Sequence, residues 1–233
     1  MKPFSISTKA FAGIASLAAV LGASSAQAAM VLSEVIVDFQ PGKPTHEDIE
    51  VWNDSSERLY VLVEPSEIEH PGTPQERRVS NPDPAISGLL ATPQRLVLEP
   101  DQRRSIRLSA VSPRGAVDRI YRVTVKPVAG PISAETTALK VLVGYDVLVL
   151  YRPQTISGDV KAQRNGHTLT IRNEGNTARE LFDGKQCDSS GQSCKTLPAT
   201  RLYAGATWEQ TVPYDTAVEY QVTSGNGAVK KQF

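Results

Sequence analysis

Apolar and polar residues alternate in short runs along most of the chain, and Pro, Gly, Asn and Asp separate these runs. No long window repeats apolar residues at the i, i+3, i+4, i+7 spacing of an amphipathic helix. Alternation with a period of two, bounded by turn residues, is typical of β-strands. The predicted strands cover residues 31–39, 46–53, 59–65, 89–98, 104–110, 119–128, 138–152, 158–163, 168–173, 178–183, 207–212 and 219–223. The predicted fold class is therefore all-β, and the spacing of the strands favours two sandwiches over one.

The N-terminal residues differ from this pattern. Lys2 and Lys9 precede an apolar stretch of small residues at 10–23, and Ala26-Gln27-Ala28 forms an Ala-x-Ala cleavage site. These features predict a secretory signal peptide over residues 1–28, and a retained membrane anchor is the alternative. The mature protein is therefore expected to be exported.

Pro153 marks the predicted boundary between two domains. Proline has no backbone N–H to donate and biases the preceding residue toward an extended conformation, so residues 153–158 are predicted to form a stiff linker. The first domain is expected at 29–152 and the second at 159–233. Both are long enough for a sandwich core of their own.

The chain has two cysteines, Cys187 and Cys194. In an oxidising compartment a local disulfide between them is expected. A metal site is the first alternative, but two thiolates with no nearby His do not complete a tetrahedral shell. A redox-active pair is the second, although such pairs usually have Cys-x-x-Cys spacing. A disulfide closing so short a loop would contribute about 2 to 3 kcal/mol and would hold one hairpin rather than a whole domain.

Charge and motifs exclude several functions. The 25 basic and 25 acidic side chains cancel, and no basic cluster marks a nucleic-acid surface. His46, His70 and His167 lie far apart, and no nucleophile, zinc or phosphate-binding motif is present. We therefore expect no enzyme activity, metal, cofactor or small-molecule substrate.

The strand predicted at 138–152 is about twice the usual strand length. Period-two alternation places Leu139, Val141, Val143 and Tyr145 on one face, and the opposite face is also largely apolar. Burial between two sheets would explain this pattern. The alternative is an exposed edge offered to another chain, because secreted proteins avoid exposed apolar edges unless a partner covers them.

The chain resembles the periplasmic pilus (fimbrial) assembly chaperones of the chaperone/usher pathway. The resemblance rests on ordered motifs of the first domain, at residues 92–102, 105–108, 120–127 and 151–153, and more loosely on 169–173 and 202–205 in the second. Two features resemble the alternate, non-classical branch of this family, namely the Cys187/Cys194 pair and the Tyr121-Arg122 pair.

This resemblance implies two immunoglobulin-like β-sandwich domains in a boomerang arrangement. It implies pilin subunits and an outer-membrane usher as partners, and the periplasm as the location. By donor-strand complementation, Leu139, Val141, Val143 and Tyr145 would fill the groove of a pilin subunit that lacks a strand. Self-association of the free protein through the same strand is a further expectation.

The chain departs from the classical pattern at one site. Classical members anchor the pilin C-terminal carboxylate with an Arg and a Lys, whereas the matching positions here hold Val37 and Leu148. Arg122 and Arg152 are the candidate substitutes, because a guanidinium group can bind a carboxylate through two hydrogen bonds. The alternative for Arg122 is a solvated arginine, and for Arg152 a salt bridge that braces the two domains.

Two other functions fit an exported all-β chain with a disulfide. One is a secreted two-domain adhesin or pilus subunit, and the other is a cell-surface binding module. Neither requires a long apolar strand, so this strand separates the chaperone hypothesis from both.

Overall fold

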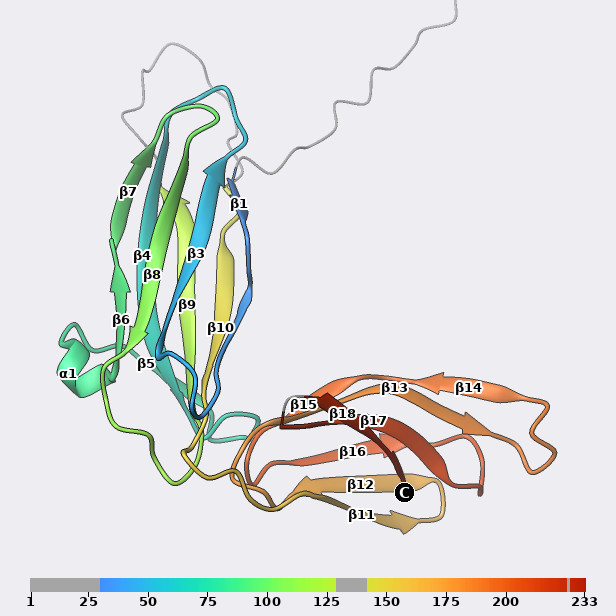
Figure 1. The fold of residues 1–233 in the computed structure, drawn as a ribbon. Coiled ribbons are helices and arrows are strands. Elements are labelled where there is room, and N and C mark those ends of the chain that lie inside the picture. Colours follow the sequence, from blue (N-terminus) through green and yellow to red (C-terminus); the bar gives the residue numbers. More distant parts are fainter. Residues whose placement is uncertain (1–29, 129–141, 226) are drawn as a thin grey trace, which may run out of the picture.

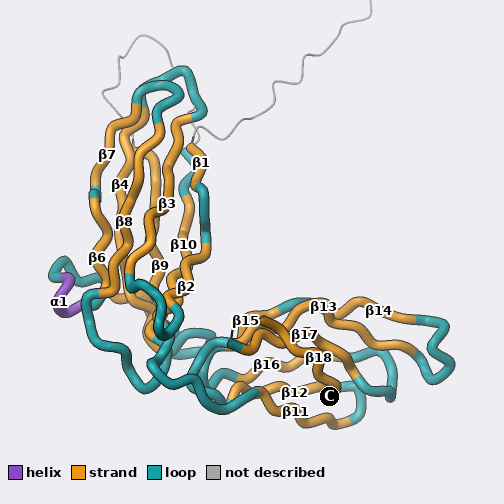
Figure 2. Tube along the Cα trace, in the orientation of Figure 1, coloured by secondary structure: helices purple, strands orange, loops and turns teal. Residues whose placement is uncertain are grey.

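The computed structural model describes residues 30–128, 142–225 and 227–233, nearly all of them in strands and connecting turns. Figures 1 and 2 show two β-sandwiches that meet at an elbow and give the molecule an L shape. This arrangement confirms the all-β fold class and the prediction of two sandwiches. The predicted signal peptide, residues 1–28, lies outside the described residues.

The first sandwich consists of a four-stranded and a six-stranded sheet. The four-stranded sheet has the order β1 (Met30–Leu32), β3 (His46–Asn53), β8 (Arg103–Ala110) and β6 (Leu89–Thr92). The six-stranded sheet has the order β2 (Ile36–Phe39), β10 (Tyr145–Tyr151), β9 (Arg119–Val128), β4 (Leu59–Glu69) and β5 (Arg77–Val79), and β7 (Arg95–Leu98) also pairs with β4. The short helix α1 (Pro84–Ser87) precedes β6.

The second sandwich consists of a three-stranded and a five-stranded sheet. The three-stranded sheet has the order β11 (Val160–Asn165), β12 (Thr168–Asn173) and β16 (Thr207–Thr211). The five-stranded sheet has the order β14 (Cys194–Leu197), β13 (Arg179–Cys187), β17 (Val218–Ser224) and β18 (Gly227–Gln232), and β15 (Thr200–Leu202) also pairs with β13. Cys187 and Cys194 face each other in the β13–β14 pair and form the expected disulfide.

Each sandwich has its own core, built by the alternation seen in the sequence. In β9, Tyr121, Val123 and Val125 point into the first core, while Ile120 lies on the opposite face. The second core includes Leu169 and other apolar residues of its two sheets. Fully burying an aliphatic side chain contributes about 1.5 to 3 kcal/mol, so these two cores are the main source of stability.

Some predicted strands divide in the structure. The predicted strand 31–39 forms β1 and β2 in different sheets, and 89–98 forms β6 and β7 in the same way. The predicted strand 138–152 begins at Tyr145 within the described residues. Strand β9 pairs with β10 only through its residues 119–125, and residues 142–144 have no strand partner. Residues 138–141 lie outside the described part of the chain.

Strand β10 is buried on both faces along its second half. Val147 and Val149 point into the first core, while Leu148 and Leu150 pack with Ile120 against Ala178 of the second sandwich. This part of the strand therefore matches the burial explanation, and it links the two sandwiches.

Candidate functional site

One backbone edge of β10 is open near its start. Along its whole length β10 pairs with β9 on one side. On the other side β2 pairs with it, in parallel, only from Leu148 to Tyr151, and the amide of Leu148 donates to the carbonyl of Val35 at 2.9 Å. Within the described residues, no strand pairs with the edge formed by Tyr145, Asp146 and Val147. An unpaired strand edge can accept a strand from another chain.

The structure describes two of the four predicted donor residues. Val143 is 59% exposed, and the neighbouring Leu142, on the other face of the predicted strand, is also exposed. Tyr145 is partly buried against the first core, and its hydroxyl donates to the carbonyl of Met30 at 3.0 Å. Leu139 and Val141 lie outside the described residues, so the role of the set stays a prediction.

A row of three residues crosses the sheet on the face turned toward the second sandwich. Ile36 on β2 is the partner of Leu148 on β10, and Leu148 is directly opposite Arg122 on β9. The family resemblance matched Val37 and Leu148 to the two classical anchor positions, but in the structure these two side chains point to opposite faces of the sheet. Val37 pairs with Val149 and is buried in the first core, because neighbouring residues of a strand point to opposite faces. Among these three residues the only cation is thus on β9.

Arg122 shares an acidic partner with a second arginine. Its Nη1 donates to the carbonyl of Asp146 at 3.2 Å, and its Nε lies 3.9 Å from the Asp146 carboxylate. Arg78 on β5 donates to the same carboxylate at 2.6 Å. The Arg122 side chain is 34% exposed, so a ligand from solution can reach it.

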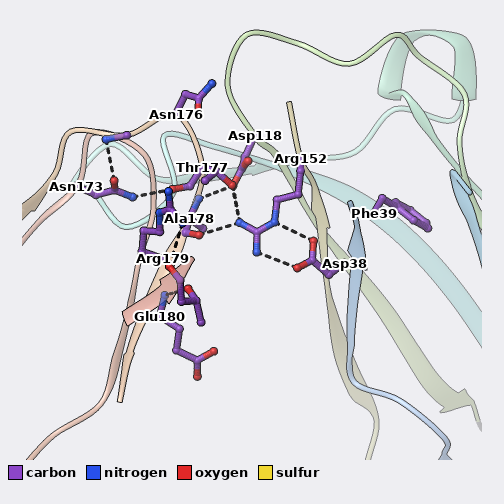
Figure 3. A network of polar contacts seen from close by, with 12 residues as sticks. Asp38, Phe39, Asp118, Arg152, Asn173, Asn176, Thr177, Ala178, Arg179 and Glu180 are labelled. Carbon is purple, nitrogen blue, oxygen red and sulfur yellow. Dashed lines mark hydrogen bonds and ion pairs between the residues drawn. The ribbon is translucent and has the colours of Figure 1, made fainter. Parts of the chain in front are cut away.

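Arg152 braces the two sandwiches and is nearly buried (Figure 3). Its Nε and Nη2 donate to the two carboxylate oxygens of Asp38, at 2.8 and 3.0 Å. Its Nη1 donates to Thr177 at 2.7 Å, to the carbonyl of Ala178 at 2.8 Å and to Asp118 at 3.2 Å. These internal partners occupy all three guanidinium nitrogens, so Arg152 fits the bracing alternative and is not free to anchor a carboxylate.

Asp118 is the most buried acid of this network. Its side chain is 3% exposed, and its Oδ2 accepts the amide of Ala178 at 2.6 Å. Burial raises the pKa of the Asp118 carboxyl, against the opposing effects of the Ala178 amide and the Arg152 charge. Burial alone would lower the pKa of Arg152, but its hydrogen bonds and charge interactions with Asp38 and Asp118 raise that pKa overall. Arg152 therefore stays charged and holds both domains.

Arg114 stabilises the backbone around Arg152. Its Nη1 donates to the carbonyls of Phe39 and Arg152, at 2.7 and 2.6 Å, and its guanidinium stacks on the ring of Tyr151. Asp38, Asp118 and Arg114 were not predicted from the sequence. Each is a single charged residue near a turn or strand end, and its role arises from partners far away in the chain.

Comparisons with known proteins agree with this fold. No family model matches the sequence. A CS1 fimbrial subunit of Escherichia coli is 25% identical over 195 residues, which cover 79% of this chain and 82% of that protein. A CFA/I fimbrial subunit of Escherichia coli is 30% identical over 149 residues, which cover 61% of this chain and 62% of that protein, less than two thirds of its length.

Solved structures match over most of the chain. The class 5 fimbriae chaperone CfaA has a TM-score of 0.65 and 23% identity, covering 87% of this chain and 98% of that one. A structure of SafA pilin in complex with the SafB chaperone of Salmonella enterica gives a TM-score of 0.60 and 16% identity. The match covers 89% of this chain and 96% of the matched chain. The chain therefore has the two-domain fold of the fimbrial chaperones, which confirms the fold that the resemblance implied. No helix among the described residues is both long and apolar enough to cross a bilayer.

Proposed function

We propose that this protein is a periplasmic chaperone that binds and caps pilin subunits by donor-strand complementation and delivers them to an outer-membrane usher. The observation that carries the proposal is the open edge of β10 at Tyr145, Asp146 and Val147, in a chain with the fimbrial chaperone fold. Such an edge supplies backbone hydrogen bonds to an added strand, and this binding needs no catalytic group.

Apolar side chains that precede this edge would supply the affinity. Val143 is exposed, and Leu139 and Val141 precede it on the same face of the predicted strand. Filling a pilin groove with these three side chains would contribute roughly 4.5 to 9 kcal/mol before ordering costs, at about 1.5 to 3 kcal/mol for each. Tyr145 would add less, because it is already partly buried against the first core. This is sufficient to hold a pilin without further chemistry.

The geometry of the edge also favours one orientation of the added strand. Strand β2 occupies the edge from Leu148 onward, so a strand added before it must end near Leu148. Arg122 lies directly opposite Leu148, and a guanidinium group attracts a carboxylate and repels an amine. The C-terminus of a pilin at this point, with Arg122 as its anchor, therefore fits better than its N-terminus.

The location is proposed from the sequence. Residues 1–28 have the features of a cleaved signal peptide, and the Cys187–Cys194 disulfide requires an oxidising compartment. Both fit an exported periplasmic protein.

Native mass spectrometry of the protein, co-expressed with candidate pilin subunits and purified from periplasm, tests this proposal. We expect a one-to-one complex with wild type that a Val141→Asp/Val143→Asp variant loses, because two charges cannot enter an apolar groove. A matched control is Val117→Asp/Val229→Asp, which changes two exposed valines away from the β10 edge and should keep the complex. Wild type that binds no pilin, or a donor variant that binds equally well, would instead favour an adhesin or a binding module.

A further inference from the structure

Arg78 comes from the far edge of the six-stranded sheet. On β5 it is the strand partner of Ile68 on β4, yet its guanidinium reaches across β4 and β9 to Asp146 on β10. On the way its Nη1 lies 3.4 Å from the hydroxyl of Thr124 on β9. One carboxylate on the open-edged strand thus holds two arginines from two different strands, Arg78 at 2.6 Å and Arg122 at 3.9 Å.

These groups border a cavity of about 500 Å³ at the elbow, to which the second sandwich contributes Tyr203. The other charged groups of its wall are engaged elsewhere: Arg77 pairs with Glu69, and the carboxylate of Glu76 accepts the amide of Gly72. Counted by themselves, Arg78, Arg122 and Asp146 carry one net positive charge, while Glu76 elsewhere in the wall keeps its negative charge. Asp146 is 44% exposed, so its carboxylate can turn into water at small cost.

We propose that Arg78 and Arg122 together form an oxyanion-binding site, and that Asp146 occupies it internally until an incoming carboxylate displaces it. The planar guanidinium groups match a carboxylate, and two of them offer more donors than Asp146 uses. This inference deepens the proposed function, because it makes Arg78 a second specificity residue for the C-terminus of a captured pilin. It also makes Asp146 a built-in competitor.

A capture experiment separates this role from a merely structural one. The dissociation constant is measured for wild type, Arg78→Gln and Asp146→Asn, with a co-expressed pilin carrying its own C-terminus or a Gly-Ser-Gly extension. We expect Arg78→Gln to weaken capture of the native pilin about tenfold, as for loss of one charge-assisted hydrogen bond, and the extended pilin much less. Asp146→Asn should strengthen capture of the native pilin about threefold, because the side chain at position 146 is then neutral and competes less well for the two arginines.

A matched control is Arg58→Gln, which breaks a comparably exposed pair with Glu99 and should bind as wild type does. A structural role for the Arg78–Asp146 pair predicts that both substitutions weaken capture or that neither does. Either of those results would overturn the inference, while wild-type capture would leave the proposed function standing.

A second measurement does not depend on a pilin. In the ¹⁵N-labelled mature protein, the Nε–H signals of Arg78 and Arg122 are followed by NMR during titration with acetate and with inorganic phosphate. Saturable shifts of both signals in wild type, together with loss of the Arg122 shift in Arg78→Gln, would support the oxyanion site with a free anion as its occupant even if no pilin is captured. Absence of any saturable shift, together with unchanged capture by Arg78→Gln, would remove the site.

Discussion

Arg122 and Leu148 face each other across the β9–β10 pair, on the side of the sheet that is turned toward the second sandwich. Leu148 is buried in the apolar contact between the two sandwiches, so its position cannot hold a charge without loss of packing. The arginine beside it lies at the rim of that contact and keeps access to solvent. Leu148 thus belongs to the apolar contact between the domains, while its strand partner Arg122 offers a positive charge at the rim of that contact.

Replacing Arg122 tests whether this cation anchors a pilin. We expect Arg122→Gln to weaken pilin capture about tenfold, because a charge-assisted hydrogen bond to the chain terminus is lost. Arg122→Lys should keep part of the affinity, since it keeps the charge but not the planar donor geometry. The measurement is the dissociation constant by biolayer interferometry, and equal binding by Arg122→Gln and wild type would remove Arg122 from the site.

The Arg152 brace is expected to dominate the stability of the elbow. Arg152→Met should destabilise the protein by about 3 to 5 kcal/mol, because it leaves Asp118 buried without its cation. Urea unfolding measures this as a lower transition midpoint. The control Arg58→Met removes an exposed pair with Glu99 and should change the free energy of unfolding by less than about 1 kcal/mol. Equal midpoints for the two variants would contradict the brace.

Local patterns predicted most of the strands but not their sheets, and β14, β15 and β18 fall outside the predicted ranges. The predicted strands 46–53, 119–128 and 168–173 match β3, β9 and β12, because alternation and turn residues are local features. The same alternation cannot show that 31–39 switches sheets between β1 and β2, since this depends on partners far away in the chain. Strand β5 and helix α1 lie outside the predicted strands, because such short elements have too few residues to show a period.

The candidate site shows the same limit. The period of two is enough to place Arg122 on the face opposite Tyr121, which points into the first core. The Cys187–Cys194 disulfide followed from two cysteines in a chain expected to be exported. Register between strands decided the rest. It placed Ile36 rather than Val37 beside Leu148, and it brought Arg78 to Asp146 across two intervening strands. No pattern within either segment contains that information.

Gly184 tests the packing of the second core. A Cβ added at this position would lie 2.3 Å from the ring of Tyr220, which is itself almost fully buried. Because a close-packed core cannot move a buried ring cheaply, Gly184→Ala should cost about 1 to 3 kcal/mol. Gly227→Ala is the matched control, since its Cβ would meet nothing within 4 Å. Thermal unfolding of both variants compares them, and equal melting temperatures would contradict the close contact.

An ion pair between β18 and the start of β11 makes part of the stability depend on pH. Asp159 accepts a hydrogen bond from Lys231, and the amide of Val160 also donates to its carboxylate. Burial raises the pKa of Asp159, but the hydrogen bond and charge of Lys231, with the Val160 amide, lower it overall from its ordinary value of 3.8. A folded-state pKa below the unfolded one means that the folded state releases this proton more readily.

The contribution of this pair is therefore fully present above pH 3.8 and is lost as the pH falls through the lower, folded-state pKa. Lys231→Gln should reduce the free energy of unfolding at pH 7 by less than about 1 kcal/mol, because the pair is partly exposed. The difference from wild type should shrink as the pH falls below 3.8, where the unfolded state also binds the proton. Urea unfolding at a series of pH values measures the difference, and one that stays constant into the acid range would show that Lys231 acts through packing rather than through Asp159.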